Sequence, residues 1–208
     1  MRNHAFKGND LCYGGFRSQC LYGGHCGSAY CRLLRVVPGV LLALQEEYEL
    51  DDGRILNGLY TAGAVGYLLM RNASVAGAEA GCQAEVGAAS AMAAAAAVEV
   101  MGGTPDMCLN AAATALSNLL GLVCDPVAGL VEAPCQTRNS MGAANALVCA
   151  EQALAGIVHM IPFDEMAGAM YHVGRSLPFE LRESALGGCA GTASACKRTC
   201  EIFGGKEA

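Results

Sequence analysis

Three cysteines stand where the chain is expected to turn. Cys82, Cys124 and Cys135 each lie within two residues of a glycine or a proline. Because glycine and proline begin or break helices, these thiols can point into a shared space. Cysteines in the middle of helices mostly pack as small apolar groups instead. The pattern therefore marks a candidate sulfur-donor site between residues 81 and 139.

Three thiolates favour one metal chemistry over another. Structural zinc usually takes four closed ligands, so three sulfurs suit it poorly. A 4Fe–4S cluster held by three sulfurs keeps one iron open as a Lewis acid, which can polarise a substrate hydroxyl. The spacing alone leaves a second interpretation open, in which Cys82, Cys124 and Cys135 are buried thiols.

Charged and polar residues accompany the cysteines. Arg138 and Asn139 follow Cys135 directly, and an arginine at this place is suited to clamp a carboxylate. Glu79 and Glu85 lie near Cys82 and are expected either to orient a ligand or to cap a helix. No residue stands out as a general base, so the catalytic residue is left unknown.

The remaining cysteines and histidines have simpler interpretations. Cys108 and Cys149 fall within predicted helices and are expected to be core thiols. Cys189, Cys196 and Cys200 lie close in sequence; a second metal site is the alternative to unligated thiols. His159 is expected to be a hydrogen-bonded structural residue.

Composition excludes several classes of function. The net charge of −6 disfavours nucleic acid and anionic membranes as partners. The three lysines, Lys7, Lys197 and Lys206, lie near the termini, which argues against pyridoxal phosphate chemistry in the central body. The apolar run of residues 86–98, mostly Ala and Gly between Glu85 and Glu99, is too short for a membrane span. The start carries no apolar signal segment, so we expect a cytoplasmic protein.

Helical patterns must position these residues. We expect an all-α fold, a single helical domain over residues 38–208 with long, buried central helices rich in Ala and Gly. Residues 1–37 show no apolar period and are expected to be a poorly ordered leader. The expected helices cover residues 38–48, 55–70, 83–101, 104–122, 139–158, 161–176, 179–184 and 192–203.

The run from about Pro38 to Phe203 resembles the α subunit, or α domain, of the iron–sulfur-dependent L-serine dehydratases (L-serine ammonia-lyases). The matching segments are residues 55–64, 72–74, 81–87, 124–130, 134–135, 138–139, 142–145, 161–165 and 177–183. The resemblance implies that Cys82, Cys124 and Cys135 hold a 4Fe–4S cluster. It also implies elimination of water from L-serine, which yields pyruvate and ammonia.

The sequence departs from this family in two ways. The Thr-Ala-Pro-Thr-Asn-Gly run that precedes the first matching helix in the family is absent, and residues 1–34 match nothing in it. The family's β domain is also missing, so a β subunit on another chain is the expected partner, in a homo- or hetero-oligomer. The alternative is a truncated, non-catalytic remnant that keeps only the helical body. We expect the chain alone to form no pyruvate.

Overall fold

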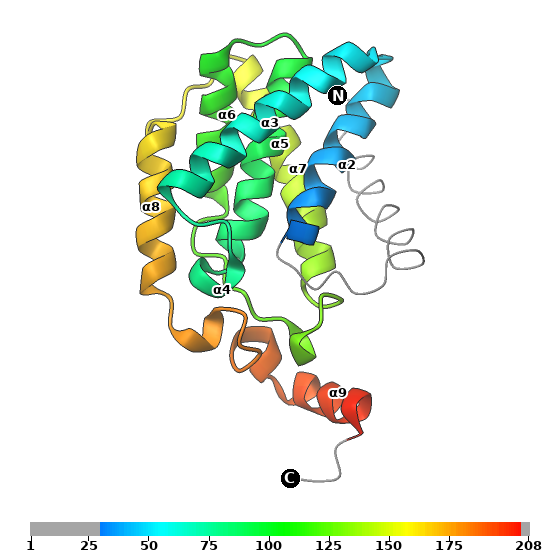
Figure 1. Cartoon of the computed structure of the whole chain (residues 1–208), viewed down its shortest axis with the longest axis vertical. Helices are drawn as coiled ribbons and strands as arrows, with labels where there is room; N and C mark the ends of the chain where they lie inside the picture. Colours follow the sequence, from blue (N-terminus) through cyan, green and yellow to red (C-terminus); the bar gives the residue numbers. More distant parts are fainter. Residues whose placement is uncertain (1–29, 205–208) are drawn as a thin grey trace.

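The computed structural model describes residues 30–204 of the chain. At its centre lies α5 (Ala88–Val100), most of whose side chains are buried. Four helices surround α5 and contact it (Figure 1): α2 (Tyr30–Tyr48), α3 (Asp52–Asn72), α6 (Pro105–Asn118) and α7 (Cys135–Leu154). Because alanine side chains are small, the neighbouring helices approach α5 closely on every side. The prediction of a buried, alanine-rich central helix is confirmed.

The remaining elements cover the side and one end of this bundle. α8 (Phe163–Ser176) packs on α6 and on the short α4 (Gly77–Ala80). A π-helix, η1 (Gln83–Gly87), leads into α5. Three 3-10 segments follow later in the chain: η2 (Val127–Gly129), η3 (Phe179–Leu181) and η4 (Gly188–Gly191). The last helix, α9 (Ala193–Phe203), lies at the end of the molecule below the bundle (Figure 1).

The all-α prediction is confirmed over the part of the chain that the structure describes. Within residues 30–204 there is no β-strand, and the single β-pairing is an isolated bridge between Cys124 and Arg182. None of the helices in that range is long and apolar enough to cross a membrane.

Side-chain caps fix three helix starts, of which the sequence predicted those at Thr104 and Thr192; the start of α3 was expected at residue 55. Asp51 accepts a hydrogen bond from the Arg54 amide at 3.1 Å, and Thr104 accepts one from the Met107 amide at 3.4 Å. Thr192 caps α9 in the same way. These caps satisfy amides that have no partner within the helix, which is why the starts are readable from sequence.

The predicted boundary at Pro38 is wrong as a helix start. α2 begins at Tyr30, and Pro38 lies inside the helix. Proline in a helix interior costs about 3 kcal/mol, whereas it is tolerated in the first turn. For this reason the sequence predicts that the helix begins at Pro38. Val36 and Val37 are both buried in the core, and their packing offsets that cost. Residues 1–29 lie outside the described residues, so the leader over that range stays a prediction.

Three further bounds differ from those predicted. α7 begins at Cys135 instead of residue 139 and ends at Leu154, and α6 ends at Asn118. The start of α7 has no side-chain cap, because Pro134 precedes it, and so it carries no sequence signal. The short helix predicted over residues 179–184 is one 3-10 turn, and residues 188–191 form another.

Candidate metal centre

Cys82 is held at the entrance to α5 by a tight backbone arrangement. It is buried and directly precedes the π-helix η1. Gly81 has φ of +75°, and a Cβ at that position would lie 2.8 Å from the Leu122 carbonyl oxygen. Since only glycine fits there, the Gln83 amide can donate to the same carbonyl at 2.9 Å. The turn at Cys82 is thereby joined to the segment that leads to Cys124.

Cys124 is fixed by the C-terminal part of the chain. Its amide donates to the Leu181 carbonyl at 2.9 Å, and its carbonyl accepts from the Glu183 amide at 2.7 Å. The residue is fully buried. A segment about sixty residues further along the chain therefore sets the position of this thiol, which no local sequence pattern indicates.

Cys82 and Cys124 meet a carboxylate. The Sγ atoms of Cys82 and Cys124 and one carboxylate oxygen of Glu85 lie within 4.8 Å of one another, and all three residues are buried. Gly77 makes room for Glu85: its amide donates to Glu85 Oε1 at 3.2 Å, and a Cβ there would lie 2.9 Å from the Glu85 carboxyl carbon. Glu85, which the sequence left open, thus belongs to the site.

Cys135 is buried at the start of α7 and is not part of this compact group. Arg138 and Asn139 follow it at three and four residues, so all three lie on neighbouring positions of one helix face. The Arg138 Nη1 atom reaches Cys82 Sγ at 3.7 Å. The face of α7 that carries Cys135 is therefore the one turned toward Cys82.

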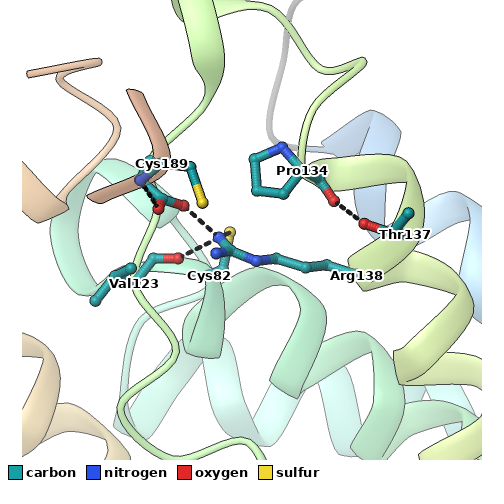
Figure 2. Close-up of polar contacts among 7 residues, drawn as sticks. Cys82, Val123, Pro134, Thr137, Arg138 and Cys189 are labelled. Atoms are coloured by element: carbon teal, nitrogen blue, oxygen red, sulfur yellow. Dashed lines mark hydrogen bonds and ion pairs between the residues drawn. The ribbon is translucent and has the colours of Figure 1, made fainter. Parts of the chain in front are cut away.

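Arg138 is held by groups of this chain (Figure 2). Its Nη1 atom donates to Asp125 Oδ1 at 2.6 Å and to the Val123 carbonyl at 2.7 Å. Burial would lower the pKa of Arg138, but the hydrogen bond to Asp125 and the attraction of Cys82 and Asp125 outweigh it and raise the pKa. The guanidinium is a permanent positive charge beside Cys82, and the carboxylate that it binds is that of Asp125.

Asp125 was missed from sequence, although its side chain organises the site. It is buried, and its second oxygen accepts a hydrogen bond from the Cys189 amide at 2.6 Å. Burial would raise the pKa of this carboxyl, but the hydrogen bonds from Cys189 and Arg138 hold the pKa below its usual range. A Cβ on Gly188 would lie 2.3 Å from Asp125 Oδ2, so that glycine permits the contact. The only sequence feature that could have drawn attention to Asp125 is its position between Cys124 and Pro126.

Asn139 is buried, and neither its side-chain oxygen nor its nitrogen has a hydrogen-bond partner among the described residues. Leaving a buried amide unpaired costs about 1–3 kcal/mol. Buried polar groups in native proteins are almost always paired, so an exception calls for an explanation such as a missing ligand. Because Asn139 follows Arg138 and lies one turn after Cys135, it is a candidate for contact with a ligand of this site.

The other described cysteines fall into two groups, buried core thiols and exposed thiols. Cys108 and Cys149 are buried in the core, and burial raises the pKa of each thiol to about 11. Cys189, Cys196 and Cys200 are exposed, and within the described range they form no close group of ligand atoms. The structure therefore gives no support to a second metal site there.

His159 lies apart from the cysteines. Its amide donates to Asn110 Oδ1 at 2.7 Å and its Nδ1 atom interacts with the Ile161 backbone, so the structural interpretation is confirmed. His159 lines a surface cavity of about 320 Å³ that contains no cysteine. Glu79 is exposed and accepts a hydrogen bond from the Ser74 hydroxyl at 2.6 Å, away from the buried group.

The sequence profile described as Serine dehydratase alpha chain matches residues 24–190. The chain belongs to the serine dehydratase alpha chain family. The family resemblance is thereby confirmed, and the expectation that residues 1–34 match nothing in the family is wrong, because the match begins at residue 24.

Individual relatives agree with this assignment. The chain is 53% identical over 170 residues to "Probable L-serine dehydratase, alpha chain" of Bacillus subtilis (strain 168), covering 82% of this chain and 57% of the relative. It is 51% identical over 168 residues to the protein of the same name from Latilactobacillus sakei, covering 81% and 80%. "L-serine dehydratase, alpha chain" of Peptoniphilus asaccharolyticus is 50% identical over 157 residues, covering 76% and 54%. The chain thus spans little more than half of the first and third of these relatives.

Proposed function

We propose that this chain binds a 4Fe–4S cluster through Cys82, Cys124 and Cys135 and contributes to the dehydration of L-serine. The carrying observation is the convergence of two buried thiols, a buried carboxylate and an arginine from segments far apart in sequence. Thiolates are the usual ligands of iron–sulfur clusters. The names of the relatives supply the substrate, and this chain's own activity is part of the proposal.

The residues present fit such a group. Arg138, which touches Cys82 Sγ, balances the negative charge that thiolate ligands bring into a buried site. Cys135 lies on the same helix face as Arg138 and brings the third thiol. When bound, a cluster with one open iron supplies a Lewis acid for a substrate hydroxyl group.

The chain's own side chains have distinct parts in this proposal. The unpaired amide of Asn139 binds a polar group of L-serine, which satisfies its hydrogen-bonding capacity. Arg138, the predicted carboxylate clamp, already holds Asp125, so its first role is to fix the Cys82 turn and the loop of Asp125. The overall reaction removes water from L-serine, and the aminoacrylate product hydrolyses to pyruvate and ammonia.

Anaerobic reconstitution with iron and sulfide tests the ligand set. About four irons per chain are expected, as this type of cluster requires. Cys82→Ala, Cys124→Ala and Cys135→Ala should each lose that stoichiometry. Cys108→Ala is the matched control, because Cys108 is equally buried but lies in the core, where its thiol faces Glu99. Full iron retention in Cys124→Ala would contradict the assignment and favour the alternative of a non-catalytic helical body with buried thiols.

A further inference from the structure

The outer face of α3 is largely apolar between residues 55 and 70. Between residues 55 and 70 the helix contains no charged residue, although it crosses the surface of the bundle in front of α5 (Figure 1). Its exposed large side chains are Leu56, Leu59, Tyr60, Tyr67, Leu68 and Met70. Tyr60 is 77% exposed. A helix that is apolar on all sides is typical of one that is covered on all sides.

The exposed residues form a regular seam. Leu56, Tyr60, Gly63, Tyr67 and Met70 follow one another at alternating intervals of four and three residues. This spacing places them in one stripe along the helix, as in the seam by which two helices pack together. The opposite face of α3 carries the buried residues Gly58, Ala62, Val65 and Leu69, which pack toward the core. The seam is therefore a second packing face without a partner in the described chain.

The seam is symmetric about Gly63. Leu56 and Met70 each lie seven residues from it, and Tyr60 and Tyr67 lie three and four residues from it. No atom lies within 4 Å of a Cβ built on Gly63, so a second helix has room to approach there. A twofold interface needs a surface that is complementary to itself, and an antiparallel copy of α3 would place Leu56 against Met70 and tyrosine against tyrosine.

The charges at the two ends of α3 also suit an antiparallel copy. Asp51 and Asp52 stand at its start and Arg71 at its end, while the exposed Arg54 is engaged by the Val100 carbonyl, to which it donates at 3.3 Å. In an antiparallel pair each acidic start lies beside a basic end, and the helix dipoles oppose each other favourably. A parallel pair would place like charges together.

The seam is a sizeable apolar patch. Its four large side chains, each at least half exposed, leave on the order of 450 Å² of apolar surface if each carries about 200 Å². This lies within the range for the largest patch on a typical monomer, about 300–600 Å². With the flanking Leu59 and a polar rim the contact approaches the roughly 800 Å² per partner of a standard stable interface. We propose that α3 joins two copies of this chain in an antiparallel pair about a twofold axis at Gly63.

Sedimentation of the full chain and of charge variants tests the proposal. The unmodified chain should be a dimer, and Tyr60→Glu with Tyr67→Glu should weaken self-association by at least about thirtyfold, since two central aromatic contacts are lost. Val158→Glu is the matched control, because Val158 is 80% exposed but lies in the loop between α7 and α8. A monomeric unmodified chain, or a dimer that the double variant leaves intact, overturns the proposal. So does a chain that remains monomeric and uses α3 to bind a different polypeptide.

Cross-linking provides a second measurement, which does not depend on weakening the association of the two copies. Gly63→Cys should form a disulfide-linked dimer on mild oxidation, because the twofold axis brings the two copies of this position together. Asn57→Cys, exposed on α3 but beside the seam, should cross-link no more than the unmodified chain, whose exposed cysteines set the background. Equal cross-linking of the two variants contradicts the proposed register.

Discussion

At the scale of single residues, the buried thiols of this chain differ in what surrounds them. Cys82 has the Arg138 guanidinium beside its sulfur, whereas Cys108 and Cys149 lie among alanine helices, with Glu99 and Asn118 as their polar neighbours. Burial disfavours the thiolate of Cys108 and Cys149 and raises the pKa of each. The same residue type therefore serves as a candidate metal ligand in one place and as a packing residue in the other.

The core thiols make the protein sensitive to alkali. Burial raises the pKa of Cys149 from 9.0 to about 11, so the folded state holds the proton that the unfolded state releases. This contribution is fully present below pH 9.0 and is lost as the pH rises through about 11. The difference corresponds to about 2–3 kcal/mol. Urea unfolding under reducing conditions should show a smaller loss of stability over this range in Cys149→Ala. The exposed Cys196→Ala should behave as the unmodified chain.

Asn139 permits a test of the ligand pocket through stability. Removal of its unpaired amide by Asn139→Ala relieves a cost of about 1–3 kcal/mol, which balances the packing that is lost, so the free energy of unfolding should stay within about 1 kcal/mol. Gln83 is the matched control, since its equally buried amide makes hydrogen bonds to the Gly121 amide and the Met170 carbonyl. Gln83→Ala should lose about 2–4 kcal/mol. A large loss in Asn139→Ala as well would indicate that the amide has a structural partner.

At the scale of elements, the sequence predicted those parts of the fold that local chemistry decides. The cap at Thr104 and the alanine run of α5 gave helices that the structure confirms. The start of α2 was missed because tertiary packing of Val36 and Val37 overrides a proline. The π-helix η1 was missed for a similar reason, since its backbone depends on contacts with distant segments.

The candidate site divides in the same way. Its cysteines, Arg138 and Asn139 were proposed from residue type, spacing and the family resemblance, and as a ligand set they stay a prediction. The role of Asp125 and the bridge from Cys124 to Arg182 were not predicted. Both depend on contacts between residues about sixty positions apart in the sequence. Contacts of this separation leave no period or cap in the sequence, and only the fold brings them into view.

The turn at Gly81 allows a prediction about the element that carries Cys82. Its φ of +75° and ψ of 179° belong to a region that is essentially restricted to glycine, and a Cβ would press on the Leu122 carbonyl. Gly81→Ala should therefore cost about 3 kcal/mol or more and reduce iron binding by separating Cys82 from Cys124. Thermal unfolding and iron content after reconstitution measure the two effects.

Gly102 is the matched control for that substitution. It also has a positive φ, +85°, but nothing lies within 4 Å of a Cβ built there. Gly102→Ala should cost only about 1–2 kcal/mol, from the left-handed backbone alone, and should leave iron binding unchanged. Equal losses in the two variants would show that the close packing of Gly81 is not important.

At the scale of the whole molecule, the candidate site lies at one end of a helical bundle and draws on nearly the full described chain. Cys82 precedes α5, Cys135 begins α7, and Cys124 is held by the segment between α8 and α9. A site assembled in this way can form only when the bundle is folded. Iron binding should therefore raise the thermal stability of the chain, because a ligand that binds only the folded state stabilises it.

Turnover makes a larger demand on the molecule than cluster binding does. Elimination of water from L-serine needs a group that accepts the α-proton and a clamp for the carboxylate, both held in reach of the substrate. Among the described residues Arg138 is engaged with Asp125, and His159 lies at a separate surface cavity. Glu85 is the acid nearest the cysteines, but it is fully buried and accepts the Gly77 amide.

We therefore predict that the reconstituted chain alone forms no pyruvate from L-serine above background under anaerobic conditions. The relatives from Bacillus subtilis and Peptoniphilus asaccharolyticus are nearly twice as long as the part that this chain spans. The proton acceptor and the carboxylate clamp are expected in such additional residues or on a partner chain. Addition of a β subunit should not restore full activity, because the Thr-Ala-Pro-Thr-Asn-Gly run stays absent from the sequence. Steady pyruvate formation by the chain alone would contradict this prediction. Glu85→Gln would then be the first variant to examine, since Glu85 is the carboxylate closest to both thiols, with His159→Asn as the second.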